Sequence, residues 1–309
     1  MARALAVAIN TFREAVRDRV LYGVLGLSLV SLLLAFALGE MALDQADRVV
    51  LDVGLASTSL FAVLVSIFLG SSLLYKEIER KTLYVILPKP IARHEFLLGK
   101  YMGIVLTAVV FVAITGGVQF MVAGMQSGLN PLWVLGVVVG LAGALALVSL
   151  RAYDRTAAIV PWSLGVCGAG IGLAASTELD LVPLASAVLL IVGEVFVLTA
   201  VALLFSAFST PFLTGLFTFG VWLVGRSADT MGTLKSSAIP DVIKTTMRQL
   251  VHVWPNFHLF VPGRNTLAAR LTEDAGPLTY VGTTMAYACA YSAVLLLIAS
   301  IIFRKRDFI

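Results

Sequence analysis

Long apolar stretches separated by short polar segments dominate the chain. A hydrocarbon core about 30 Å thick needs roughly 20 residues of helix to cross it. We predict eight transmembrane helices on this basis, over residues 20–39, 53–75, 101–125, 131–150, 157–176, 184–206, 211–225 and 279–303. The fifth stretch contains Pro161 and the seventh is short, so these two fit the required length least well. The pattern predicts an all-α polytopic integral membrane protein.

Composition and charge give this protein an orientation. Hydrophobic residues make up 59% of the chain and charged residues 13%. If the N-terminus is cytoplasmic, the positive-inside rule is satisfied by the basic residues of the short inner segments, which include Arg13, Arg17, Arg19, Lys76, Arg80, Lys81, Arg151, Arg155, Arg304, Lys305 and Arg306. The short outer turns are acidic instead, with Glu40, Asp44, Asp47, Asp52, Glu178 and Asp180, whereas Arg226 falls in the outer loop. Both termini are therefore predicted to be cytoplasmic, and the net charge of +4 reflects topology and not a nucleic-acid partner.

Three soluble segments accompany the spans. Residues 1–19 predict an interfacial amphipathic helix, with Leu5, Ile9, Phe12, Val16 and Val20 on one apolar stripe in lipid. This helix either only anchors the chain or also docks a partner. Residues 226–277 form a large outer loop with a second predicted amphipathic helix, which leaves room for an extracytoplasmic partner, and 278–309 hold the last span and a basic cytoplasmic tail.

The cytoplasmic loop 76–100 is the most informative soluble segment. A charged helical turn up to Leu83 is followed by Pro88 and Pro90, which stop a helix, and helix resumes from His94 to Lys100. From composition alone it is either an ordinary basic loop or the docking point of a partner protein that acts on the spans. The shorter turn Ser206–Pro211 is a second helix break on the same side.

Four segments in this order resemble the permease subunits of ABC-2 type exporters. They are INTFREAVRDRVLYG, LLYKEIERKTLYVILPKPIARHEFLLGK, LLFSAFSTPFLTGLFTFG and IFRKRDF, and the likeness covers residues 1–126 and 184–309. Residues 127–183 look like an insertion, since six spans are usual in that family, and Lys81 stands where the family usually has glycine.

The resemblance implies a function and a set of contacts. It implies a permease dimer, formed with a second copy or a homologue in the cytoplasmic (inner) membrane, that couples ATP hydrolysis by a separate ATPase subunit to export. The implied contacts with that subunit are Glu79, Lys81, Thr82, Pro88, Pro90, Arg93 and Lys100 in the first loop and Ser206, Ser209 and Pro211 in the second. ATP and Mg²⁺ would bind to the partner, so this chain would need no cofactor.

Motifs for chemistry within the chain are absent. No G-x-x-x-x-G-K-[ST] phosphate loop occurs, since Gly99-Lys100 is followed by Tyr101, and there is no G-x-S-x-G elbow. His94-Glu95 fails as a zinc-protease motif because position 98 is leucine. We therefore predict that the chain is not an enzyme and has no catalytic residues. His252 and His258 either share a metal ion or are interfacial polar residues; we favour the second, and predict no metal site.

Glu194 is the acidic residue deepest inside a predicted span. A carboxylate there is costly, so it should face protein or water. It either contacts a substrate or proton on a pathway or makes a hydrogen bond between helices, with Gln119 or Thr199 as partners; it has no evident charged partner. We favour helix packing.

Three further functions stay open at this stage. One is an ATP-independent secondary transporter that uses Glu194, another is an intramembrane enzyme such as a lipid-modifying transferase, and the third is an ABC subunit that transmits force to an outer-side partner. Small residues at a spacing of four predict close helix packing, within the insertion or across a dimer, at Gly136, Gly140, Ala144, Gly168 and Gly172.

Overall fold

A computed structural model of the chain describes residues 2–42, 45–79, 92–151, 156–227, 254–261 and 276–305. Throughout these ranges the regular structure is helical. The elements are α1 (Ala2–Val16), α2 (Arg19–Met41), α3 (Ala46–Glu79), α5 (Arg93–Gln126), α6 (Pro131–Arg151), α7 (Ile159–Ala174), α8 (Leu181–Ser206), α9 (Pro211–Arg226), the 3-10 turn η1 (Phe257–Phe260) and α13 (Pro277–Lys305). The predicted all-α class is confirmed. The amphipathic helix expected in 226–277 and the end of the tail lie outside the described residues.

Each of the eight predicted spans is a helix, but they differ in length. Six are long and apolar enough to cross a bilayer, namely α2, α3, α5, α6, α8 and α13. The remaining two, α7 and α9, have 16 residues each, so each is about 24 Å long. They coincide with the two stretches that fitted least well in sequence. The chain is a multi-pass membrane protein.

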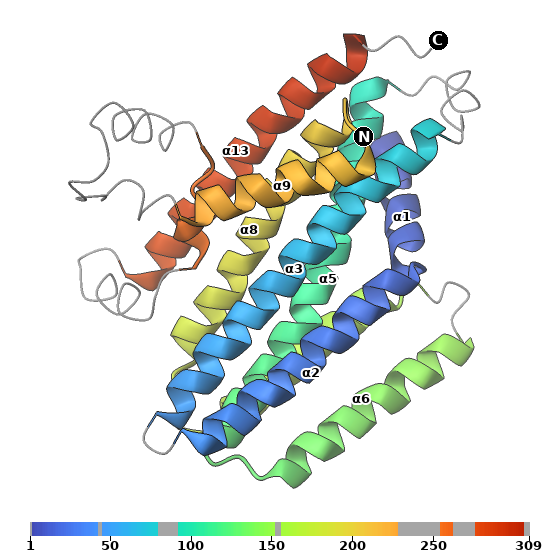
Figure 1. Cartoon of the computed structure of the whole chain (residues 1–309). Coiled ribbons are helices and arrows are strands. Elements are labelled where there is room, and N and C mark those ends of the chain that lie inside the picture. Colours follow the sequence, from blue (N-terminus) through green and yellow to red (C-terminus); the bar gives the residue numbers. More distant parts are fainter. Residues whose placement is uncertain are drawn as a thin grey trace, which may run out of the picture.

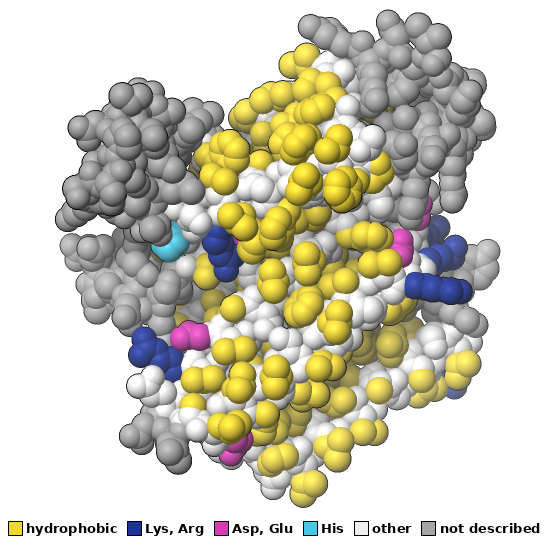
Figure 2. Space-filling model, viewed as in Figure 1, with side chains coloured by type: hydrophobic (Ala, Val, Ile, Leu, Met, Phe, Trp, Pro, Cys, Tyr) yellow, Lys and Arg dark blue, Asp and Glu magenta, His cyan; other side chains and the backbone are white. Residues whose placement is uncertain are grey.

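The helices form a tilted bundle with α5 and α8 at its centre (Figure 1). α8 packs between α13 and α3, while α5 is covered by α1, α3 and α7. α9 crosses obliquely over α3 and α8, and α6 stands apart beside α2 (Figure 1). The surface on this side is a nearly continuous apolar field, with basic and acidic side chains confined to its edges (Figure 2). Such a surface suits a lipid environment and not water.

The N-terminal helix is held against the start of α5 by close backbone contact. A Cβ atom on Gly99 would lie 2.6 Å from the carbonyl oxygen of Ala4, and one on Gly103 would lie 2.6 Å from that of Ala8. Only glycine lets the two helices approach this closely. α1 is therefore part of the bundle and not a loosely attached surface helix.

The apolar stripe predicted for the N-terminal helix is only partly buried. Phe12 and Val16 are buried against α5, whereas Leu5 and Ile9 are exposed. The helix ends at Val16, earlier than predicted, because Asp18 caps α2 by accepting a hydrogen bond of 3.0 Å from the amide of Val20. The prediction that the whole stripe lies in lipid is wrong for Phe12 and Val16, whereas Val20, in α2, is exposed.

The glycines predicted to pack helices inside the chain are the wrong ones. A Cβ on Gly136, Gly140, Gly168 or Gly172 would meet nothing within 4 Å. Close approach in α7 instead occurs at Gly170, which lies against the backbone of Gly117 in α5. Spacing identifies a smooth helix face, but the tertiary arrangement decides which face meets a neighbour. Packing across a dimer is not tested by these contacts.

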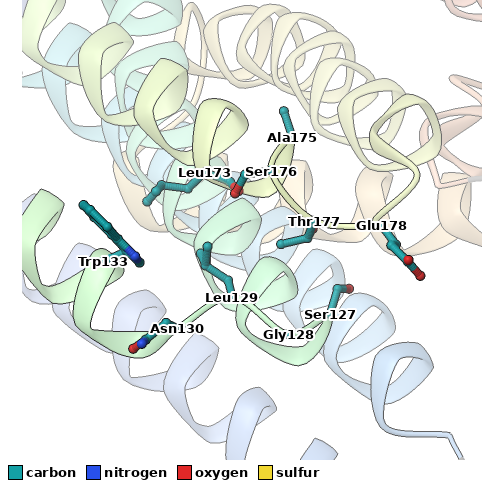
Figure 3. A pocket seen from close by; sticks show the side chains of 10 residues that line it. All are labelled: Ser127, Gly128, Leu129, Asn130, Trp133, Leu173, Ala175, Ser176, Thr177 and Glu178. Carbon is teal, nitrogen blue, oxygen red and sulfur yellow. The ribbon is translucent and has the colours of Figure 1, made fainter.

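The stretch 127–183, which the sequence suggested is an insertion, contains the two consecutive helices α6 and α7. α6 begins and α7 ends at the same end of the bundle. There, residues 127–130 lie opposite residues 175–178 around a cavity of about 770 Å³. Trp133 and Leu129 face Ser176 and Thr177 across this opening (Figure 3). α6 has no buried residue along its described length. The hairpin thus attaches to the bundle mainly through α7.

Candidate functional site

A buried charged cluster lies in the middle of the bundle. The side chain of Glu194 in α8 is fully buried and its Oε1 atom lies 2.8 Å from Nη1 of Arg226, at the end of α9. The indole Nε1 of Trp222 donates a hydrogen bond of 2.8 Å to the same oxygen, and the hydroxyl of Ser59 in α3 donates one of 2.7 Å to Oε2. Arg226 Nη1 also donates to the Ser59 hydroxyl at 3.1 Å. Three helices therefore meet at one carboxylate.

The oblique course of α9 brings this arginine to the carboxylate. Glu194 lies about 20 Å along α8 from its first residue, Leu181, at 1.5 Å per residue. α9 starts at Pro211, shortly after α8 ends, and slants across the bundle until Arg226 reaches the depth of Glu194 (Figure 1). α9 thus ends inside the bundle and not at its far side.

The cluster is electrostatically compensated. A charge taken out of water costs several kcal/mol unless it is paired and hydrogen-bonded. An ionised Glu194 would be paired with a guanidinium and would accept hydrogen bonds from an indole and a hydroxyl, which are the donors it needs. The side chain of Arg226 is itself 27% exposed and its Cζ atom lies 5.3 Å from the centre of the Trp222 ring, in cation–π range.

The segment around η1 closes the cluster on one side. Trp254 donates a hydrogen bond of 3.0 Å from its indole nitrogen to the carbonyl of Val221, one residue before Trp222. The backbone of Gly225 lies directly against Pro255 and Phe257, so that no Cβ would fit there. η1 is in turn fastened to α13, because the hydroxyl of Tyr280 donates to the carbonyl of Leu259 at 2.7 Å. The end of α9 therefore contacts Glu194 as well as the segment around η1.

Three sequence predictions about this cluster are corrected. Arg226 is not an outer-loop residue but the charged partner that Glu194 was expected to lack. Gln119 donates to the carbonyl of Val50 at 3.1 Å and not to Glu194. Thr199 is buried, but its hydroxyl has no hydrogen-bond partner among the described residues. The sequence signal that could have found the pair is an arginine at the end of an unusually short apolar stretch.

The predicted contact residue Arg93 lies at the end of the bundle that holds α1 and the last turns of α13. Phe96 and Leu97 of α5, Ala207 after α8 and Phe303 of α13 belong to one buried cluster. The rings of Phe96 and Phe303 stack with centroids 6.4 Å apart, and Arg93 donates from Nη1 to the Phe303 carbonyl at 3.4 Å. The predicted contact residue Arg93 therefore joins the start of α5 to the end of α13.

Lys100 is not on the surface. Its side chain is 1% exposed, with Nζ 3.8 Å from Oε2 of Glu14 in α1 and 5.9 Å from the centre of the Phe96 ring. A cation buried between two helices links them through charge and through its apolar stem. Any part of Lys100 in coupling would pass through α1 and not through a direct contact with another subunit.

The turn between α8 and α9 is built by its hydroxyl groups. Ser209 donates to the carbonyl of Phe205 at 2.9 Å and shares a hydrogen bond of 2.6 Å with Thr214. Pro211 stands in the first turn of α9, where its missing amide costs nothing. Ser206 is buried at the end of α8. The helix break predicted at Ser206–Pro211 is confirmed as a rigid reversal.

The remaining predicted contact residues are only partly described. Glu79 is the last residue of α3, and residues 80–91 separate it in the chain from Arg93, the first residue of α5. Lys81, Thr82, Pro88 and Pro90 lie outside the described residues, as does His252. His258 is described in η1 and is exposed. Across the described ranges no three His, Cys, Asp or Glu side chains gather in a way that could hold a metal ion.

Comparison with known proteins identifies a family for the chain. A family model described as ABC-2 family transporter protein matches residues 5–308, which is nearly the whole chain and includes the hairpin of α6 and α7. No curated protein matches the chain.

Proposed function

Because the chain belongs to the ABC-2 family of transporter proteins, we propose that it is the membrane-spanning subunit through which a separate ATPase drives export of a substrate across the cytoplasmic membrane. A permease role in an ABC-type system follows from the family. The coupling route, the export direction and the dimer with a second permease copy are the proposal.

The observation that carries the coupling route is the connected end of the bundle. Residues 80–91 connect the end of α3 to the start of α5, so any force on this segment acts on Glu79 and Arg93 first. Arg93 and Phe96 pass it to α13 through Phe303. An ATPase seated on residues 76–100 would therefore move α3, α5 and α13 together, as a packed unit.

α1 would be a second element through which force at this end of the bundle reaches α5. It is pressed against α5 at Gly99 and Gly103 and linked to it by the pair Lys100–Glu14. The exposed side of α1 carries Arg13 beside apolar residues, which suits the interface between a membrane and an ATPase subunit. This arrangement supports a cytoplasmic location for the end that carries α1, in agreement with the basic residues there.

The contacts of Glu194 favour this function over an ATP-independent transporter. The carboxylate is enclosed by Arg226, Trp222 and Ser59, so a substrate or proton would first have to break the ion pair. We assign the pair a structural role: it fixes where α9 ends against α3 and α8. Which solute moves, or whether an outer-side partner receives force, is left to the purified complex.

The test is to purify the tagged chain in mild detergent from its native membrane and to assay ATPase activity in the eluate. A separate ATPase should co-purify, and Glu79→Ala or Arg93→Ala should lower its recovery by at least about tenfold, as loss of a hot-spot contact does. Asp47→Ala and Arg48→Ala are matched controls, since both residues are exposed near the opposite end of α3, and they should leave recovery unchanged.

Since Arg93 also binds the Phe303 carbonyl, each variant is first checked for an unchanged unfolding midpoint. Equal ATPase recovery with all four folded variants would contradict the coupling route. A folded chain that never co-purifies with an ATPase would contradict the proposed function as a whole.

A further inference from the structure

A second cavity opens on the lipid-facing side, between α2 and α6. It has a volume of about 470 Å³, with α5 as its floor and α7 behind it. On α5 it extends from Thr107 to Ile114, about 10 Å along the helix axis. It lies outside the charged cluster around Glu194, and Val16, the last residue of α1, lines it on the side of the proposed coupling end.

The interior of this cleft offers almost nothing to a polar ligand. Thr107 donates its hydroxyl to the carbonyl of Gly103 at 2.9 Å, and Ser149 donates to that of Ala146 at 2.8 Å. The indole of Trp162 donates to the carbonyl of Leu141 at 2.9 Å. Because these donors are already used, the cleft selects for an apolar ligand.

The wall formed by α6 is held loosely, which keeps the cleft open. α6 has no buried residue along its described length and contacts the bundle mainly through α7. On the cleft side it presents the small residues Ala142 and Ala146.

The mouth of the cleft is basic. Tyr22 lines it near the start of α2, and Arg19, one turn earlier on the same helix face, is exposed. Across the mouth, Ser149 lies next to the end of α6, where Arg151 is exposed. Lys and Arg side chains gather at the edge where α1 meets α2 (Figure 2). The nearby carboxylate of Asp18 accepts a hydrogen bond from the amide of Val20 and keeps its charge, so two arginines and one carboxylate leave the mouth net positive.

We propose that the cleft between α2 and α6 binds one acyl chain of an anionic glycerophospholipid, whose phosphate lies beside Arg19 and Arg151. The apolar interior takes the chain, and the arginines at its mouth take the headgroup. The lipid fills the space that α6 leaves and joins the hairpin of α6 and α7 to the rest of the bundle.

The experiment uses the full-length protein, stripped of lipid in detergent and then mixed with phosphatidylglycerol or phosphatidylcholine that carry the same acyl chains. Native mass spectrometry counts the lipids that stay bound. One phosphatidylglycerol should be retained per chain, in preference to phosphatidylcholine. Arg19→Gln should weaken phosphatidylglycerol retention about fivefold, the typical effect of one basic residue at an anionic membrane surface.

Variants on α6 separate the cleft from general lipid adhesion. Ala146→Phe fills the cleft and should lower retention roughly tenfold. Ala144→Phe places the same ring on the face of α6 that does not line the cleft and should bind lipid like the unmodified chain. Ala142→Leu fills less of the space and keeps the test usable if Ala146→Phe does not fold.

Two results would overturn the proposal. One is equal retention by the cleft variants and by Ala144→Phe, which would mean that lipid adheres elsewhere. The other is equal retention of the two lipids by the unmodified chain, which would remove the headgroup contact with Arg19 and Arg151.

Discussion

Replacing Arg226 with methionine should destabilise the bundle more than any other single charge removal among the described residues. The change leaves Glu194, which is fully buried, without its guanidinium at 2.8 Å. The hydrogen bonds from Ser59 and Trp222 remain, but neither carries a compensating charge. Removing one partner of a buried ion pair typically costs about 3–5 kcal/mol, which corresponds to a fall of roughly 6–20 °C in unfolding midpoint.

Replacing Glu194 instead of Arg226 should lower the free energy of unfolding by less, because Arg226 is partly exposed. Glu194→Gln leaves Arg226 with 27% of its side chain exposed and with the Trp222 ring beneath it. The arginine can therefore keep part of its hydration, and we expect a loss of about 1–2 kcal/mol. The double variant should be no worse than Glu194→Gln by more than about 1 kcal/mol, since neither charge is then left alone.

The assay is thermal unfolding of the purified protein in one detergent, with Arg48→Met as the matched control. Arg48 pairs with Asp52 at 3.9 Å on the surface of α3, with about half of each side chain exposed, and such a pair contributes less than about 1 kcal/mol. Equal midpoints for Arg226→Met and Arg48→Met would refute the buried pair. Additive losses in the double variant would show that the two residues do not interact.

Two further changes test the attachment of α1. Gly103→Ala places a methyl group 2.6 Å from a backbone oxygen of α1 and should lower the free energy of unfolding by about 1–3 kcal/mol. The control Gly136→Ala has open space around it and should raise the unfolding midpoint slightly or leave it unchanged. Equal midpoints for the two variants would disprove the close contact. Lys100→Met keeps the apolar stem and removes the cost of burying a cation 3.8 Å from Glu14, so the free energy of unfolding should stay within about 1 kcal/mol of the original value. A loss above 2 kcal/mol in chemical unfolding would mean that the charge itself holds α1.

Hydrophobic length and turn chemistry were enough to find the helices of this protein. All eight predicted spans are helices, and the break at Ser206–Pro211 occurs where serine and proline predicted it. Helix formation in a bilayer is a local requirement, because each segment must satisfy its own backbone hydrogen bonds. That is why the order of elements could be inferred from the chain alone, whereas the family was suggested by the resemblance of four sequence segments.

Which helix faces meet could not be inferred in the same way. Regular spacing pointed to Gly136 and Gly140, yet the close contacts are made by Gly99 and Gly103 with α1 and by Gly170 with α5. A smooth face favours contact with any neighbour, and lipid is as apolar as another helix. The partner of such a face is set by how all the helices pack together.

The sequence by itself determined that this protein is an all-helical membrane protein, since the length and hydrophobicity of its segments follow from residues counted along the chain. The tertiary structure alone decided that α9 slants and ends inside the bundle, which moves Arg226 from the expected outer loop to the side of Glu194. The physical reason is that a short helix carrying an arginine gains more stability by pairing with a buried carboxylate 32 residues away than by running parallel to its neighbours. This stabilisation exists only once α3, α8 and α9 are assembled.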